Sequence, residues 1–211
     1  MRTPLVTTLL LILFCSAGTA HAIELEGVGV KAGGAFLTGN FSFEGRDAID
    51  DDTRIGLVAG AFTEWKLQRD SAFRVVVEGL YVRKGYEGTR SIEAIDDEPI
   101  DVQVGADYLS IPVLGRVLFV DEELSVYALF GPSLELLLSN DEDPLLDELT
   151  DWSIAGNVAI GLEYAIADPA RLLFELRFNT DLTDNFDGDD DLLGINEARY
   201  QMLQVTGGIR Y

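Results

Sequence analysis

The stretch RYQMLQVTGGIRY, residues 199–211, alternates in character from one residue to the next. Leu203, Val205 and Ile209 fall on one side of this alternation, whereas Gln204 and Arg210 fall on the other. A period of two predicts a β-strand with one apolar and one polar face. If earlier segments share this pattern, the strand can pair with the first of them and close a cylinder whose apolar face looks outward into lipid.

Seven earlier segments repeat the alternation, and the connections between them alternate between long and short. Short connections and an even strand number are typical of outer-membrane barrels, in which the short turns and both termini are periplasmic. We therefore predict an all-β fold, an eight-stranded antiparallel up-and-down transmembrane β-barrel with its long loops outside the cell. Pro112 and Pro132, nearly opposite each other, predict a bend or bulge because proline removes a ladder donor. The predicted strands cover residues 27–37, 55–67, 73–85, 107–119, 125–138, 152–164, 171–179 and 199–211, and the long loops cover 38–54, 86–105, 139–151 and 181–198.

Residues 1–22 have the organisation of a cleaved export signal. Arg2 supplies a positive start, residues 5–15 form an apolar core too short to span a membrane, and Ala20 and Ala22 are spaced as a cleavage site. We expect a signal peptide at residues 1–22 and one barrel domain at 23–211. Cleavage removes the chain's one cysteine, Cys15, and its one histidine, His21. Disulfides, thiolate nucleophiles and Ser-His triads are therefore not expected.

Five segments of the predicted strands and turns carry a resemblance to known proteins: YLSIPVLGRVLF (residues 108–119), YALFGPSLELLL (127–138), GLEYAI (161–166), ELRFNTDLTD (175–184) and GGIRY (207–211). They resemble the outer-membrane β-barrel domain family that includes the PorT-like proteins. The resemblance spans essentially the whole predicted mature chain, and its motifs are strand and turn patterns without a catalytic signature. It implies a small eight-stranded outer-membrane barrel.

Charged residues recur on the side of the alternation predicted to face the barrel interior. Buried charges persist only when they are paired, so this set predicts a salt-bridged lumen. Carboxylate pairs for acid–base catalysis are an alternative, but the neighbouring lysines and arginines would keep them ionised. We therefore predict no enzymatic activity. The predicted inward charges are Lys31, Glu64, Lys66, Arg74, Glu78, Arg116, Glu135, Glu163, Glu175, Arg177 and Arg210.

Most of the chain's 37 acidic residues fall in the four predicted long loops, and the formal net charge is −22. This charge argues against nucleic acid as a partner. We call these four acidic loops the acidic rim. Carboxylate clusters are hard oxygen donors, so the acidic rim predicts at most weak Ca²⁺ or Mg²⁺ binding, and no other cofactor is expected. Such cations could tether anionic lipopolysaccharide. The candidate metal ligands are Asp50, Asp51, Asp52, Asp189, Asp190 and Asp191.

Three functions remain open from the sequence. The first is a non-enzymatic outer-membrane barrel with a structural or surface-interaction role and a plugged lumen; the second is an accessory barrel of a secretion system, as the PorT-like resemblance implies. The third is a soluble lipocalin-like carrier, although such barrels turn their larger apolar side chains inward. For the first, the expected partners are outer-membrane lipid, lipopolysaccharide and the barrel-assembly machinery, and we expect a monomer.

Overall fold

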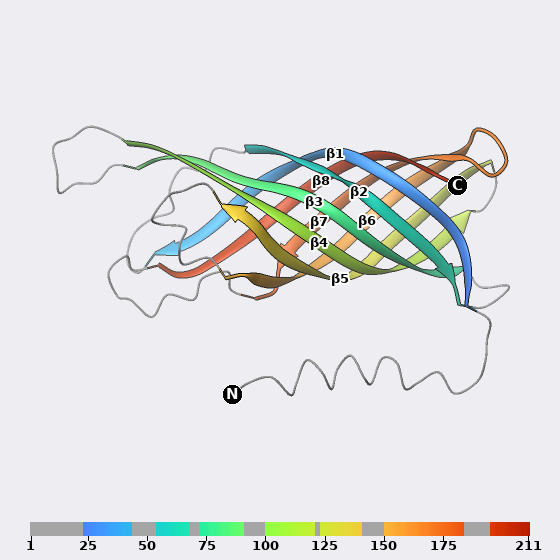
Figure 1. The fold of residues 1–211 in the computed structure, drawn as a ribbon, viewed down its shortest axis with the longest axis horizontal. Coiled ribbons are helices and arrows are strands. Elements are labelled where there is room, and N and C mark those ends of the chain that lie inside the picture. Colours follow the sequence, from blue (N-terminus) through green and yellow to red (C-terminus); the bar gives the residue numbers. More distant parts are fainter. Residues whose placement is uncertain are drawn as a thin grey trace, which may run out of the picture.

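The chain folds into a closed antiparallel β-barrel (Figure 1). The computed structural model describes residues 23–43, 54–67, 72–90, 100–120, 123–140, 150–183 and 195–211. No helix among these residues is long and apolar enough to cross a membrane. The predicted eight-stranded fold is confirmed. The strands are β1 (Glu24–Phe43), β2 (Arg54–Lys66), β3 (Phe73–Arg90), β4 (Ile100–Val120), β5 (Leu124–Asn140), β6 (Trp152–Ala165), β7 (Arg171–Asp181) and β8 (Ile195–Arg210).

The barrel closes where β1 pairs with β8, the strand from which the sequence analysis began. Val28 and Tyr211 exchange two backbone hydrogen bonds, of 2.9 and 2.8 Å, at one end of this seam. At Gly33 the two backbones approach so closely that a Cβ atom would lie 1.9 Å from the carbonyl oxygen of Val205. The seam therefore depends on glycine for close contact and leaves no sheet edge open.

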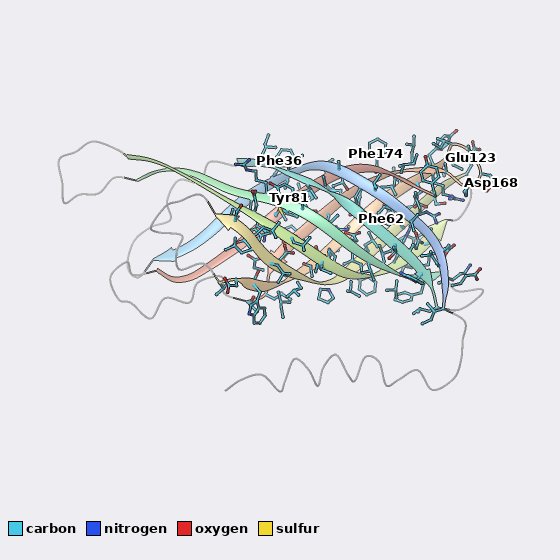
Figure 2. All side chains as sticks on the ribbon, in the orientation of Figure 1. Phe36, Phe62, Tyr81, Glu123, Asp168 and Phe174 are labelled. Atoms are coloured by element: carbon cyan, nitrogen blue, oxygen red, sulfur yellow. The ribbon has the colours of Figure 1, made fainter. Side chains whose placement is uncertain are left out.

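Side chains alternate between a lipid-type exterior and a charged interior, as β7 illustrates. Phe174 is 64% exposed and Leu176 is 42% exposed on the outer surface, whereas Glu175 and Arg177 between them are buried inside. Figure 2 shows Phe174 on the outside and Phe62 within the barrel. The same parity holds on the other strands, so the apolar belt surrounds the barrel. This arrangement is the reverse of a lipocalin-type carrier.

Three connections are short and lie at one end of the barrel with the start of β1 and the end of β8 (Figure 1). They join β2 to β3, β4 to β5 and β6 to β7. Glu123 and Asp168, from two of these connections, lie at this end (Figure 2). The other four connections, which are longer in sequence, all leave the opposite end. The predicted alternation of long and short connections is confirmed.

Several strands are longer than the sequence predicts. The prediction was therefore wrong for parts of the long loops, which are strand in the structure. The ladder between β3 and β4 continues to the pair Arg90 and Ile100, inside the loop predicted at residues 86–105. Likewise β1 continues to Phe43 and β8 begins at Ile195. The extensions are antiparallel backbone ladders between neighbouring strands, and backbone pairing does not require a particular side chain at each position.

The predicted irregularity at the two prolines is present between β4 and β5. Pairing in this ladder stops at Pro112 and resumes at Gly115. Next to Pro132, Gly131 has a φ of 155°, and a Cβ atom there would lie 2.3 Å from the carbonyl oxygen of Val113. Glycine therefore lets the two strands stay in contact where proline has removed hydrogen-bond donors.

The apolar belt predicts a depth-dependent response to charge. Leu176 lies midway along β7, and Leu172 lies near the short-connection end, opposite Tyr164. We expect Leu176→Arg to reduce the free energy of unfolding in lipid vesicles by about 2–4 kcal/mol, because lipid cannot solvate the guanidinium. The matched variant Leu172→Arg should reduce the free energy of unfolding by no more than about 1 kcal/mol, because the arginine side chain at this position can reach the membrane–water interface. Equal losses in urea titrations would contradict this placement of the belt.

Candidate functional site

The barrel interior is the candidate site because it concentrates the ionisable side chains of all eight strands. Its ion pairs join equal numbers of cations and anions among the described residues. They form three groups, which we name by their position between the short-connection end and the opposite end. The lower cluster is Glu26, Glu64, Arg74, Arg116, Glu163, Arg171 and Arg210; the central cluster is Lys31, Glu78, Glu175 and Arg177; the upper cluster is Lys84, Glu135 and Asp181.

The central cluster crosses the lumen and joins β1, β3 and β7. Glu78 on β3 accepts hydrogen bonds from Lys31 Nζ at 2.7 Å and from two Arg177 nitrogens at 2.8 and 2.9 Å. Glu175 pairs with the same two cations, at 3.2 Å from Lys31 and 2.6 Å from Arg177. These four side chains are between 1% and 4% exposed. The cluster is therefore electrically neutral and closed to solvent.

The lower cluster is organised around Arg116. Its Nη1 lies 2.6 Å from Glu64 and its Nη2 lies 2.8 Å from Glu163, and its guanidinium stacks 4.0 Å from the centroid of the Tyr127 ring. Arg210 on β8 also pairs with Glu163, at 3.2 Å. A planar guanidinium with several donors suits this role, because it can pair with two carboxylates and stack on a ring at once.

Apolar and aromatic side chains fill the space between the charged clusters. Phe62, Val76, Leu114, Tyr127 and Leu129 belong to one buried group inside the barrel. The cavity between this group and the central cluster has a volume of about 10 Å³. Such a volume holds roughly one water molecule. At this level the described side chains form a packed core.

The sequence analysis identified most of these charges, but not all of them. Glu26, Lys84, Arg171 and Asp181 also form interior ion pairs. The prediction that placed Asp181 in an exposed loop was wrong: it is buried, at 3% exposure, and pairs with Lys84. The inward parity of the predicted strands already includes Lys84 and Arg171, and two more residues of β7 reach Asp181. Glu26 does not follow the odd-numbered inward parity of β1, because a register shift lies between Leu25 and Gly27.

Two further predictions have different outcomes. Lys66, predicted to point inward, makes no ion pair with the described residues and is partly exposed. The candidate metal ligands Asp50–Asp52 and Asp189–Asp191 lie outside the described residues, so the acidic-rim site stays a prediction. Within the described residues, no group of three or more histidine, cysteine or acidic side chains is arranged to hold a metal ion.

Removal of one member of the central cluster should be far more damaging than loss of an exterior pair. We expect Glu78→Ala to lower the free energy of unfolding by about 3–5 kcal/mol, because two buried cations are left to share one carboxylate, Glu175. The matched control is Arg83→Ala, since Arg83 lies 3.9 Å from Asp107 on the outer surface with its side chain 53% exposed. That change should cost less than about 1 kcal/mol. Urea unfolding followed by tryptophan fluorescence measures both, and similar costs would refute the special role of the interior pairs.

Comparison with known proteins agrees with this architecture. Neisserial surface protein A (NspA) aligns with a TM-score of 0.52 at 17% identity, covering 87% of this chain and 95% of that chain. OprG from Pseudomonas aeruginosa aligns with a TM-score of 0.45 at 10% identity, covering 89% and 96% of the two chains. No curated protein matches the sequence. The family model of the outer membrane protein β-barrel domain matches residues 24–187. The chain therefore belongs to the outer membrane protein β-barrel domain family, and it is an outer-membrane protein.

Proposed function

We propose that this protein is a non-conducting, non-enzymatic outer-membrane barrel with a structural or surface-interaction role. The observation that carries the proposal is the central cluster, whose four ion-paired side chains cross the lumen beside a cavity of only about 10 Å³. An eight-stranded barrel is just wide enough for side chains to fill it. A lumen occupied in this way supports a scaffold role in preference to transport.

The same pairing supports a role without catalysis. A general acid or base must exchange a proton with a substrate, and a nucleophile needs a base within hydrogen-bond reach. Glu78 and Glu175 are each held between Lys31 and Arg177, and their side chains are at most 4% exposed. Such carboxylates cannot contact a substrate. The proposed interaction role is therefore a function of the outer surface of the molecule.

Planar-bilayer recording tests the plugged lumen. Purified barrel inserted into the bilayer should give no steady, ion-selective conductance, because an ion would have to displace the central cluster. A deliberate opening serves as the positive control: Lys31→Ser, Glu78→Ser, Glu175→Ser and Arg177→Ser combined should raise the conductance if that variant folds. Steady selective conductance from the wild-type protein would reject the proposal and favour a porin-like function.

The orientation that we propose places the short connections, the start of β1 and the end of β8 in the periplasm. Its support is the grouping of the short connections at one end, because barrels of this class have short periplasmic turns and longer external loops. The longer connections would then carry any interaction at the cell surface.

Single cysteines on exposed positions at the two ends test this orientation. Asp151 lies just before β6 at the end with the longer connections, and Ala167 lies in the short connection between β6 and β7. A membrane-impermeant thiol reagent should label Asp151→Cys in intact cells and should label Ala167→Cys only after the outer membrane is permeabilised. The opposite pattern would invert the topology.

A further inference from the structure

Tyr127 on β5 lies between the lower and central clusters and is held in one orientation. The Arg116 guanidinium stacks on its ring, 4.0 Å from the centroid. On the side of β6 the ring lies against Gly161, its partner in the backbone ladder. A Cβ atom at Gly161 would lie 2.1 Å from Cζ of Tyr127 and 2.3 Å from the hydroxyl oxygen, so glycine is what leaves room for the ring. These two contacts fix the hydroxyl beside Glu175 of the central cluster.

Three polar groups near this ring are poorly satisfied by the described residues. The Tyr127 hydroxyl lies 3.5 Å from Oε2 of Glu175, which is longer than the roughly 2.5–3.0 Å of an ordinary hydroxyl hydrogen bond. Lys31 approaches the same Oε2 only to 3.4 Å, whereas Arg177 donates to Oε1 of Glu175 at 2.9 Å. Arg116 Nε is buried and has no hydrogen-bond partner among the described residues. One donor is therefore unpaired, and a hydroxyl and a carboxylate oxygen face each other across too long a gap.

The residues that carry these groups line one cavity. Arg116, Tyr127 and Glu175 share a volume of about 10 Å³ with Lys31 and Glu78, and the rest of the lining is apolar. This volume holds about one water molecule, and a buried water makes about two to four hydrogen bonds. Cavities that stay empty have apolar walls, whereas residues of this wall carry an unpaired donor and a weakly paired acceptor. The size and the polarity of the cavity therefore match a single water molecule.

We propose that this cavity is a binding site for one ordered water molecule. The water accepts hydrogen bonds from the Tyr127 hydroxyl and from Arg116 Nε, and it donates one to Oε2 of Glu175. An ion of either sign fits this site less well. A cation there would meet Lys31 and Arg116, and an anion would meet Glu78 and Glu175. A neutral molecule that both donates and accepts avoids both conflicts.

The bound water links the lower cluster to the central cluster. Arg116 forms its ion pairs with Glu64 and Glu163, both in the lower cluster. Through the water it also reaches Glu175 of the central cluster, so the two clusters become one hydrogen-bonded network with Tyr127 at the junction. The inference goes beyond the proposed scaffold role, because a plugged lumen can be dry or can hold a fixed water. A single enclosed water is not a conducting path.

A crystal structure of the wild-type barrel, at a resolution that shows internal water, tests the site directly. We expect one solvent peak within about 3.2 Å of all three polar atoms, which are Tyr127 Oη, Glu175 Oε2 and Arg116 Nε. A cavity without a solvent peak would overturn the proposal. So would a short direct hydrogen bond from the Tyr127 hydroxyl to Glu175, because it would leave the water without its place.

One added methyl group distinguishes a water-filled cavity from an empty one. Val76 lines the cavity, so Val76→Ile should displace the water, leave Arg116 Nε unpaired and lower the urea midpoint of the purified barrel. In an empty cavity the same methyl group would fill space and raise the midpoint. The matched control is Val82→Ile, since Val82 is also buried on β3 but belongs to the second apolar group, which does not line this cavity. The unfolding equilibrium constant of Val76→Ile should exceed that of Val82→Ile about 3- to 10-fold.

Tyr127→Phe assigns the effect to the hydroxyl. It removes one partner of the water, so Val76→Ile should raise the unfolding equilibrium constant less in this background than in the wild type, whereas Val82→Ile should have the same effect in both. A higher midpoint for Val76→Ile, or an equal effect in both backgrounds, would reject the water site. The crystal structure needs no variant, so it decides alone if Val76→Ile does not fold. Conductance has a separate readout, so a silent bilayer together with an empty cavity would reject the water and leave the plugged barrel intact.

Discussion

The structure depends on the requirement that every charge inside a closed eight-stranded barrel finds an opposite charge. Burying an unpaired ion costs several kcal/mol, and a barrel this narrow holds too little water to solvate it. Glu78 shows the consequence: it brings together Lys31 of β1 and Arg177 of β7, which lie 47 and 99 residues away in the chain. Interior pairing therefore joins strands that share no backbone ladder.

This requirement also fixes the outer surface. Successive residues of a strand face opposite sides, so a one-residue slip of β7 would send Arg177 into the lipid and Leu176 into the charged lumen. Both errors are costly at once, because lipid solvates a guanidinium poorly and Glu78 would lose one of its two cationic partners. The charged interior and the apolar belt thus select the same register from both sides of the sheet. Burying so many charged side chains costs desolvation free energy, and in return the ion pairs select one pairing register for the strands.

The number of strands, their parity and the closing seam follow from alternation that is visible in the sequence, as Leu176 and Arg177 illustrate. Alternation cannot show which carboxylate meets which cation, because that depends on how the strands are staggered around the barrel. It also does not show where a strand ends, because backbone pairing can continue beyond the segment in which the alternation is clear. For this reason the continuation of the β3–β4 ladder to Arg90 and the burial of Asp181 were missed, although Asp181 keeps the odd-numbered inward parity of Glu175 and Arg177.

The charges are balanced over the whole interior but not at each end. Among the described residues, the lower cluster holds more arginines than glutamates, and the upper cluster holds more carboxylates than ammonium groups. The neutral central cluster lies between the two excesses. The negative excess of the upper cluster lies at the same end as the acidic longer connections. At the opposite end the arginine excess of the lumen lies near acidic side chains of the short connections, Glu123 and Asp168 among them, so an excess inside the barrel does not by itself set the charge of that end.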